Sequence, residues 1–493
     1  MAIGYKVSKR RFERRGGNVL CLGIFVSTIP KNFQSVIDKT MFLAVQFTDA
    51  GYDIYIVGGP VRDGFVKRPY GENTQAPDID LTTNAKPEDT ERILSKFADA
   101  MWSQGKRFGT IGALHNGQKF EITTHRSESY SSASRHPNVA FGNDIEEDLA
   151  RRDFTVNAMA IKLPEIKLID PFGGLEDLLQ HKILKTPIDA GESFSDDPLR
   201  MLRAARFSCG YKLTPVDDLI EAVQGMYERL KIVSAERIRD EFNLLITLPD
   251  PQLGLWFILK NKLAEVFLPE LPALSLEQDP IHKHKDVLSH TVAVVAKTPP
   301  DLVLRLAALL HDIGKPKTRS ISQSGVSFHH HDIVGAKMAR KRLEALRYSN
   351  DQIEQVYKLI ALHLRFHTYK MGWTESAIRR YARDAGDLLE KLNALTRADC
   401  TTRNKAKADA LMASIDEFED RYEELKAREE LDAIRPELDG IEVMAELALA
   451  PGPMVGKAMS YLLEIRLEEG LLGKDEARAR LRDWYRVNQI TEK

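Results

Sequence analysis

The strongest candidates for catalytic residues are two aspartates whose spacing would place them on one side of a β-strand. Asp78 and Asp80 form an Asp-x-Asp pair directly before a Leu-Thr-Thr run. Residues i and i+2 of a strand point to the same side, so the two carboxylates repel each other unless a cation lies between them. Mg²⁺ takes few protein carboxylates and completes its shell with substrate phosphates. The pair predicts a two-metal Mg²⁺ site for phosphoryl or nucleotidyl transfer; the alternative is a solvated acidic loop.

A glycine turn precedes the aspartates. The apolar run 54–57 leads into Gly58-Gly59, and a helix is expected at Val61 to Phe65. Paired glycines allow close approach to the backbone, and the start of a helix offers free N–H groups to a phosphate. Alone such a turn is weak evidence, but here Arg62 and then the aspartates follow it. Together they predict a phosphate-binding turn beside the carboxylates.

The stretch from Val57 to Thr83, VGGPVRD followed by DIDLTT, resembles the nucleotidyltransferase signature of the DNA polymerase β superfamily. This motif is similar to that of class II CCA-adding tRNA nucleotidyltransferases and bacterial poly(A) polymerases. The resemblance implies a catalytic head in which Gly58, Gly59 and Arg62 bind nucleotide. It also implies tRNA, CTP and ATP as partners and no membrane.

A hairpin is predicted after the aspartates. Strands at Gly109–His115 and Lys119–Thr124 flank Asn116-Gly117, a strong hairpin signal. Glu121, on the second strand, would lie beside the aspartates if the strands are neighbours, and a paired surface glutamate fits the local sequence equally well. The resemblance implies that Glu121 is the third catalytic carboxylate. It also implies a nucleotide-binding role for Arg126, which ends a Thr-His-Arg run where the family has Thr-Phe-Arg.

A second motif, DLARRDFTVNA, occupies residues 148–158 and matches the family's RRDFTxNA pattern. Arg151 and Arg152 suit the neutralisation of triphosphate oxygens. Asp153 and Asn157 are four apart, so they are expected to share a helix face, bind a ribose hydroxyl and order the arginines. The alternative is a helix cap with solvated arginines.

A third motif, SDDPLRMLRAARF, occupies residues 195–207. Pro198 suits a first helical position, so Asp197 could simply cap the helix. Asp197 and Arg200 also place an acceptor and a donor fork on adjacent turns, which resembles the family's amino-acid template for the incoming base. Arg203 and Arg206 continue the positive stripe and are predicted to bind nucleotide too.

Nine of the thirteen histidines lie between His282 and His367, which predicts a second site. The order His…His-Asp…Asp resembles the HD phosphohydrolase superfamily. It implies separate helices that each deliver a ligand to a divalent metal of unknown identity, since imidazole and carboxylate suit Mn, Fe, Ni, Co, Zn or Mg. The implied ligands are His290, His311, Asp312 and Asp399, with His331 and His363 as candidates for a second metal or for phosphate.

The elements that must carry these residues are mostly helical after the first third of the chain. Helices are expected at 31–50 and Pro87–Trp102, and a capped helix from Ser234 is expected to hold the template helix by ion pairs. We predict an α+β fold with a polymerase-β-like head of mixed sheet and helices, followed by all-α neck, HD and tail domains. The expected ranges are 1–30 for a flexible extension, 31–175 for the head, 176–275 for the neck, 276–420 for the HD domain and 421–493 for a tail that contacts tRNA.

Composition limits the remaining options. The chain has 493 residues, 43% hydrophobic and 29% charged, which fits a multidomain globular protein. Its net charge of −2 means that local basic patches must hold any RNA. Three cysteines lie far apart and predict reduced thiols and a cytoplasmic location. The basic and apolar stretch within residues 1–30 resembles the start of a signal peptide, but no cleavage site follows and it is too short to span a bilayer.

The predicted function is therefore addition of CMP, CMP and AMP to the 3′ end of tRNA by two-metal catalysis. Within the same family, poly(A) synthesis or partial addition of only CC or only A remains open. An alternative from another class is a metal-dependent phosphohydrolase centred on the HD site, with the head as an RNA-binding platform. Intact Asp78 and Asp80 argue against an inactive head.

Overall fold

A computed structural model describes residues 30–66, 78–103, 105–106, 109–125, 141–275, 286–322, 325–366, 373–400, 405–429 and 435–491. Residues 1–29 of the expected extension and the predicted nucleotide ligand Arg126 lie outside the described residues. The chain forms two compact units. The first takes the chain up to Glu241 together with Trp256–Val266, and the second takes Phe242–Leu255 and the chain from Phe267 onward.

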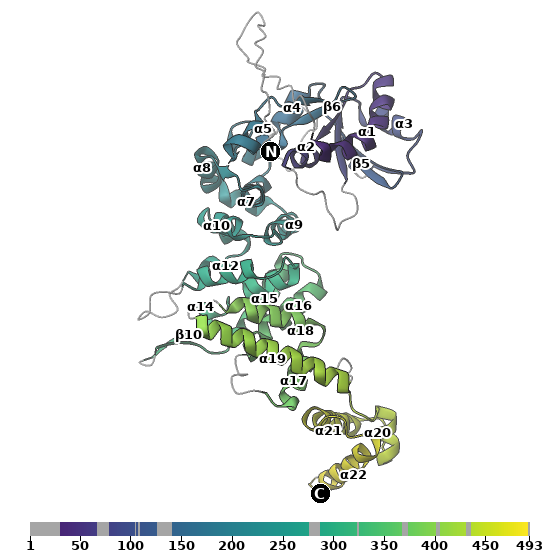
Figure 1. The fold of residues 1–493 in the computed structure, drawn as a ribbon, viewed down its shortest axis with the longest axis vertical. Coiled ribbons are helices and arrows are strands. Elements are labelled where there is room, and N and C mark those ends of the chain that lie inside the picture. The colour runs from purple at the N-terminus through teal and green to yellow at the C-terminus, as the bar shows by residue number, and fades with distance from the viewer. Residues whose placement is uncertain are drawn as a thin grey trace, which may run out of the picture. The chain divides into compact units, whose positions relative to one another are not determined.

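A seven-stranded mixed sheet forms the core of the first unit, in the order β3-β4-β5-β2-β1-β6-β7 (Figure 1). Strands β2 and β5 pair in parallel, and the other neighbours pair antiparallel. The predicted mixed sheet is confirmed. The strands are β1 Ile54–Val57, β2 Ile79–Thr83, β3 Ala100–Trp102, β4 Thr110–His115, β5 Gln118–Thr124, β6 Ala160–Leu163 and β7 Lys167–Ile169.

The predicted hairpin is also confirmed. Asn116 and Gly117 adopt φ angles of 50° and 74°, the left-handed pair that joins β4 to β5. All four residues of β1 are buried, as expected for a central strand, and β5 alternates between buried and more exposed positions. The hairpin thereby brings β5 beside β2.

Helices α1 Lys31–Asp49 and α2 Gly59–Val66 pack together next to the sheet. A Cβ atom added at Gly64 would lie 2.4 Å from the ring of Phe33, so a glycine is required for the close approach of these helices. The helix predicted at 31–50 is confirmed, and the helix expected at Val61 to Phe65 is present but begins earlier, at Gly59.

The predicted helix Pro87–Trp102 is wrong in its second half. Helix α3 covers only Pro87–Leu94, and β3 then pairs antiparallel with β4. Trp102 covers Gly112 of β4, where a Cβ atom would fall 2.0 Å from the indole ring. Tertiary packing on a glycine in the neighbouring strand therefore decides a segment whose local pattern fits a helix.

Short helices complete the first unit and lead into the second. Helix α9 begins in the first unit and ends in the second. The neck helices are α6 Ala190–Asp196, α7 Leu199–Tyr211, α8 Asp217–Met226, α9 Ala235–Ile246, α10 Gln252–Lys260 and α11 Leu263–Phe267.

The chain after the head is mainly helical, as predicted, but not all-α. In the part of the chain that the structure describes, β8 Ile183–Leu184 pairs with β9 Thr214–Pro215 in the neck, and β10 Arg319–Ser322 pairs with β11 Gly325–Phe328 in the second unit. Among the described residues, no helix is long and apolar enough to cross a membrane. The main helices are α12 Val287–Lys297, α13 Leu302–Leu310, α14 Lys315–Thr318, α15 His331–Ala345, α16 Asn350–Leu362, α17 Glu375–Ala385, α18 Leu389–Asp399, α19 Lys405–Glu429, α20 Gly440–Leu447, α21 Pro453–Glu469 and α22 Lys474–Thr491.

A buried arginine fixes helix α13, which leads into the His-Asp pair. Arg305 is 1% exposed, and its guanidinium donates only to backbone carbonyls among the hydrogen bonds seen in the described residues. Two of these carbonyls, on Thr298 and Pro299, follow α12, and three, on Ile246, Leu248 and Pro249, lie at and after the end of α9. Carbonyls at helix ends lack partners within the helix, so Arg305 satisfies several of them at once.

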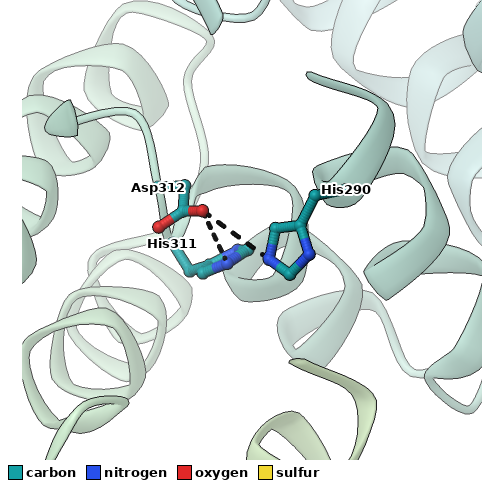
Figure 2. Close-up of side chains that lie close together, drawn as sticks. All are labelled: His290, His311 and Asp312. Atoms are coloured by element: carbon teal, nitrogen blue, oxygen red, sulfur yellow. Dashed lines mark ion pairs between the residues drawn. The ribbon is translucent and has the colours of Figure 1, made fainter. Parts of the chain in front are cut away.

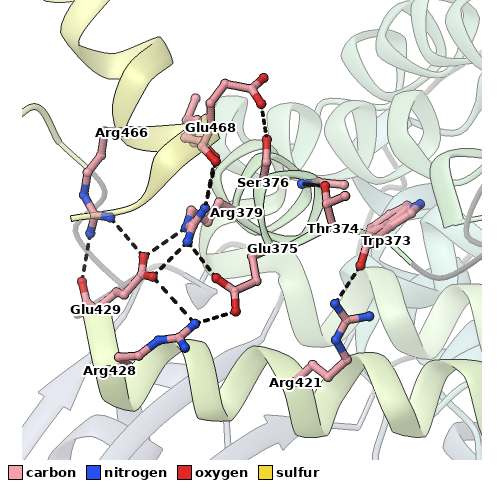
Figure 3. Close-up of polar contacts among 12 residues, drawn as sticks. Trp373, Thr374, Glu375, Ser376, Arg379, Arg421, Arg428, Glu429, Arg466 and Glu468 are labelled. Carbon is pink, nitrogen blue, oxygen red and sulfur yellow. Dashed lines mark hydrogen bonds and ion pairs between the residues drawn. The ribbon is translucent and has the colours of Figure 1, made fainter. Parts of the chain in front are cut away.

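A buried ion network joins the last helices to the helices before them (Figure 3). Glu429 of α19 accepts hydrogen bonds from Arg379 of α17 at 2.8 and 2.9 Å and from Arg466 of α21 at 3.0 Å. The three side chains are 7%, 2% and 3% exposed. Gly470, with φ of +87°, lies against this network, since a Cβ atom there would be 2.8 Å from Arg379. This buried network therefore joins α17, α19 and α21 within the second unit.

Candidate functional site

The three predicted catalytic carboxylates lie together on neighbouring strands. Asp80 of β2 pairs in register with Glu121 of β5, and Asp78 directly precedes β2. The surrounding protein desolvates the carboxyl group of Asp80, although part of the residue is exposed. This desolvation, with the charges of Glu121 and Asp78 and against that of Arg152, raises the pKa of Asp80 to about 6. Three carboxylates gathered at one place, with the pKa of Asp80 raised, fit a site completed by a divalent cation.

The glycine turn touches both this carboxylate and a predicted phosphate ligand. Gly58 follows β1 with φ of +72°. A Cβ atom there would lie 3.2 Å from Nη1 of Arg152 and 3.7 Å from Oδ2 of Asp80. Arg152 forms an ion pair with Asp148 at 3.4 Å, and its Nε has no hydrogen-bond partner within the described part of the chain. A buried, unpartnered donor beside the carboxylates suits an anionic ligand.

One cavity of about 400 Å³ brings the predicted motifs together. Asp80 lines it along with the arginines of the second motif and the two template residues of the third. Asp148 and Asp196 also line it. They belong to the second and third motifs, but neither was predicted as a site residue. The lining residues are Val57, Asp80, Leu81, Thr123, Asp148, Arg151, Arg152, Asp196, Asp197 and Arg200.

Several predicted nucleotide ligands do not line this cavity but form a polar network next to it. Arg62 is 7% exposed and donates to Asn157 at 2.5 Å and to Asp63 at 2.9 Å. Asn157 donates to Asp153 at 2.9 Å. The guanidinium of Arg62 also lies 4.3 Å from the ring centre of Tyr211. Arg62 and Asn157 are therefore placed to order the turn around the cavity.

The α-helix expected to carry Asp153 and Asn157 is absent. Helix α4, Ile145–Ala150, ends before them, and Thr155–Asn157 form a short 3₁₀-helix. The Asp153 side chain accepts the N–H of Phe154, which competes with helical hydrogen bonding. The prediction of one shared helix face is wrong, yet the two side chains still meet.

Arg203 and Arg206 pair with acids rather than lining the cavity. Arg203 donates to Asp153 at 2.8 Å and lies 3.6 Å from Glu241, and Arg206 pairs with the same Glu241. Burial alone would raise the pKa of Asp153, but Arg203 and Asn157 lower it to about 2. Since Glu241 lies on α9, the predicted ion pairs between this helix and the template helix α7 are confirmed.

The two predicted template residues lie side by side at the start of α7. Asp197 accepts the N–H of Leu199 at 3.1 Å, so it does cap the helix as the alternative interpretation held. Its second oxygen accepts from Arg237 of α9 at 2.7 Å. Because Asp197 and Arg200 also line the cavity, capping and contact with a ligand are compatible.

The predicted HD ligands meet in the second unit. Asp312, in the turn after α13, has a carboxylate oxygen 3.2 Å from Nε2 of His311 and 3.7 Å from Nε2 of His290 (Figure 2). Asp399, at the end of α18, lies 2.9 Å from His290 and 3.6 Å from His311. The predicted ligands therefore come from separate elements, except that His311 and Asp312 share the turn after α13 instead of coming from one helix each.

Two further histidines share Asp312 with this group. Asp312, His331 and His363 offer ligand atoms within 4.8 Å of one another, and so do His290, His311 and Asp312. His331 is the first residue of α15, and His363 follows α16. Gly314 allows this assembly, because a Cβ atom there would lie 2.2 Å from the carbonyl oxygen of His331.

Backbone contacts set the orientation of three of these rings. The Nδ1 atoms of His311, His331 and His363 lie 2.8, 2.7 and 2.6 Å from the carbonyl oxygens of residues three positions earlier. Such bonds require the proton on Nδ1 and leave Nε2 free to bind a metal. Nε2 of His311 has no hydrogen-bond partner among the described residues. The donor set therefore fits divalent metal.

The charges of the group are strongly coupled. Burial favours a neutral ring at His311, but the carboxylates of Asp312 and Asp399 raise its pKa to about 10. Burial and the nearby His311 lower the pKa of His363 to about 4. The carboxylates therefore favour a positive charge at this centre, which a divalent cation would supply.

Comparison with known proteins supports the division into these two sites. Residues 54–184 match the poly A polymerase head domain family, residues 213–274 match a probable RNA and SrmB-binding site of polymerase A, and residues 287–404 match the HD domain family. Nucleotidyltransferases and HD proteins of these families depend on divalent metals.

Two relatives that align with most of this chain are named as an A-adding tRNA nucleotidyltransferase and a CCA-adding enzyme. The A-adding tRNA nucleotidyltransferase of Deinococcus radiodurans is 32% identical over 394 residues, covering 76% of this chain and 88% of the relative. The CCA-adding enzyme of Streptococcus pyogenes is 29% identical over 456 residues, 91% of this chain and 96% of the relative.

Solved structures share the fold. The CCA-adding enzyme of Bacillus stearothermophilus in complex with CTP has a TM-score of 0.67 at 22% identity, covering 94% of this chain and 99% of the other. The CCA-adding enzyme of Thermotoga maritima complexed with tRNA has a TM-score of 0.55 at 16% identity, covering 92% and 96%.

Proposed function

The chain belongs to the family of tRNA nucleotidyltransferases that includes A-adding and CCA-adding enzymes, and from this premise we propose that it adds CMP, CMP and AMP from CTP and ATP to the 3′ end of tRNA. One observation carries the proposal. A single cavity holds Asp80 together with the acceptor-donor pair of Asp197 and Arg200. An enzyme that chooses the base with its own side chains needs both features in one place.

The 3′ hydroxyl of tRNA attacks the α-phosphate of the nucleotide, and pyrophosphate leaves. Asp78 and Asp80 would hold Mg²⁺, which would supply charge stabilisation for the attacking hydroxyl and for the leaving pyrophosphate. Glu121 adds a third carboxylate in register with Asp80. Arg151 and Arg152 bind the triphosphate, and Gly58 lets it approach the backbone.

Base choice follows from donor and acceptor order. Cytosine and adenine both present an amino donor beside a ring-nitrogen acceptor, and uracil and guanine reverse this order. An ionised Asp197 only accepts, and Arg200 only donates, so the pair complements C and A. Each buried mismatch costs about 1–3 kcal/mol. Two mismatches give roughly 10²-fold discrimination.

Binding of tRNA is supported by the match of residues 213–274 to an RNA-binding segment. The tail contact with tRNA remains a prediction, as does the cytoplasmic location favoured by three separate cysteines. The wider family also permits A addition alone, since a relative at 32% identity has that name.

The experiment that tests the proposal uses three tRNA transcripts, which lack CCA, lack CA or lack only the final A. Each is incubated with purified protein and with each nucleoside triphosphate separately and in combination, and the products are sequenced. We expect C, C and A on the first transcript, C and A on the second and A on the third. Extension of the third transcript alone would show an A-adding enzyme instead, and long A tails would show a poly(A) polymerase.

A second candidate function is favoured by the pre-oriented histidines of the second unit. His311, His331 and His363 have their Nδ1 atoms bonded to backbone carbonyls, and each belongs to a group of possible metal ligands that includes Asp312. His290, His311, Asp312 and Asp399 would hold a divalent metal there, which would supply Lewis-acid chemistry for the hydrolysis of phosphate esters. Lys315, 2.6 Å from Asp312, adds a positive charge at the site for a phosphate. We expect a phosphatase or a 2′,3′-cyclic phosphodiesterase.

This activity is tested by assaying nucleoside monophosphates and 2′,3′-cyclic phosphates with Mn²⁺, Ni²⁺, Co²⁺, Zn²⁺ and Mg²⁺ in turn. Activity in the parent that His311→Ala removes supports hydrolysis at this centre. If the metal-loaded parent hydrolyses none of these substrates, the centre has a structural role.

A further inference from the structure

A serine for which no role was predicted forms hydrogen bonds with both predicted template residues. Ser193 lies in α6 and is fully buried, with 0% exposure. Its carbonyl oxygen accepts the backbone N–H of Asp197 at 3.2 Å and Nη1 of Arg200 at 3.3 Å. Its hydroxyl oxygen accepts from the same Nη1 at 2.7 Å. One residue is therefore bonded to the acceptor residue and to the donor residue of the template.

The guanidinium of Arg200 is held at its other end as well. Nη2 of Arg200 donates to the carbonyl oxygen of Arg151 at 2.5 Å. A guanidinium carries five N–H donors, so these three bonds leave two donors for a ligand in the cavity. All three acceptors are uncharged, so they orient Arg200 without neutralising it. The plane of the donor fork is then set before a nucleotide arrives.

We propose that Ser193 is a positioning residue for base selection, which fixes the orientation of Arg200 relative to Asp197. The inference rests on the proposed function, because it needs Arg200 to read the base. A fork in one fixed orientation rejects uracil, since its two remaining donors cannot follow a displaced acceptor. A fork that turns freely can reach the O4 carbonyl of uracil, and discrimination falls.

Ser193→Ala isolates the hydroxyl. The variant keeps the backbone carbonyl that bonds Asp197 and Arg200, and alanine is favourable in a helix. Loss of one hydrogen bond to a charged group corresponds to roughly 10-fold in an equilibrium. We expect the ratio of kcat/KM for CTP over UTP to fall about 10-fold on a tRNA that lacks CCA.

Two variants separate positioning from general damage. Ser208→Ala is the matched control, because Ser208 is a buried serine of α7 whose hydroxyl donates to Ala205 at 3.1 Å. It should leave the CTP/UTP ratio unchanged. Ser193→Cys keeps the volume but replaces a good acceptor with a weak one, so it should shift the ratio in the same direction as Ser193→Ala. Melting temperatures of all three variants are measured alongside.

The experiment compares single-turnover incorporation of CTP and UTP by the parent, the serine variants and Arg200→Ala. The inference is supported if the CTP/UTP ratio falls in Arg200→Ala, Ser193→Ala and Ser193→Cys. The ratio of Ser208→Ala should equal that of the parent. If Arg200→Ala loses the ratio but both Ser193 variants keep it, Ser193 has no role in selection and the template survives. If Arg200→Ala keeps the ratio, the template and this inference both fail.

Discussion

The head site and the HD centre both gather acids around a place for metal, but they do so with different ligands and supports. In the head, Asp80 and Glu121 stand on neighbouring strands and Asp80 lines a cavity shared with arginines. In the HD centre, His311 and Asp312 are each 1% exposed and come from a turn at the end of a helix.

This difference shows which centre is complete without substrate. His311, His331 and His363 have their rings oriented by backbone carbonyls at Nδ1, so their nitrogen ligands are oriented before metal binds. The head offers only carboxylates as metal ligands. Arg152 beside them is a positive side chain suited to bind an anionic ligand. We infer that the head binds its metal together with nucleotide and that the HD centre retains metal alone.

The largest expected effect is in the head. Asp80→Asn should lower nucleotide addition by roughly 10³-fold or more, because a metal ligand supports several kcal/mol of charge stabilisation. Binding of tRNA, measured by filter retention, should persist, and the metal content of the HD centre should not change. Addition at near-parent rates would contradict the assignment of Asp80.

The HD centre gives the next effect, on metal content. His311→Ala should reduce tightly bound divalent metal, measured by elemental analysis after dialysis, since it removes a buried Nε2 ligand. Replacing an exposed histidine of the same unit, His329→Ala, serves as the control and should retain metal. Equal metal in both variants would exclude His311 as a ligand.

Base selection should fall by roughly 10-fold in each of two single variants. Asp197→Ala and Arg200→Ala each remove one side of the acceptor-donor pair, and the two groups together account for roughly 10² in selectivity. The measurement compares the rates at which UTP and GTP are incorporated with the rates for CTP and ATP. If both variants reject UTP as the parent does, Asp197 is only a helix cap.

The smallest effect concerns pH and stability in the head. Burial lowers the pKa of His125, whose Nδ1 lies 2.9 Å from the hydroxyl of Thr82. An unfolded chain binds this proton more readily, so stability from the neutral ring is present above pH 6.5 and is lost as pH falls. His125→Phe should therefore lose less stability than the parent between pH 7.5 and 5.5 in thermal melts. An equal loss in both proteins would rule out His125 as the source.

Local patterns predicted the parts of the head that local geometry decides. The Asn116-Gly117 hairpin follows from strand periodicity and turn chemistry, whereas the position of Glu121 beside Asp80 was implied only by the family resemblance. The strand that ends in Trp102 could not be predicted, because it depends on Gly112 in another strand.

The arginines show the same limit at the site. Arg151, Arg152 and Arg200 reach the cavity, but Arg203 and Arg206 turn to acids supplied by other elements. No local signal separates these two groups of arginines in the motif. Ser193 was missed for a related reason, because its importance lies in a contact with Arg200 across the junction of two helices.

The most direct test of two independent centres is metal removal followed by selective return. Protein is stripped with a chelator, Mg²⁺ alone is added back, and addition of C, C and A to a tRNA lacking CCA is followed in the parent and in His311→Ala. We predict full and equal recovery in both proteins, because carboxylates of the head and the nucleotide suffice to hold Mg²⁺. Recovery that requires a transition metal, or that fails in His311→Ala, would contradict the account.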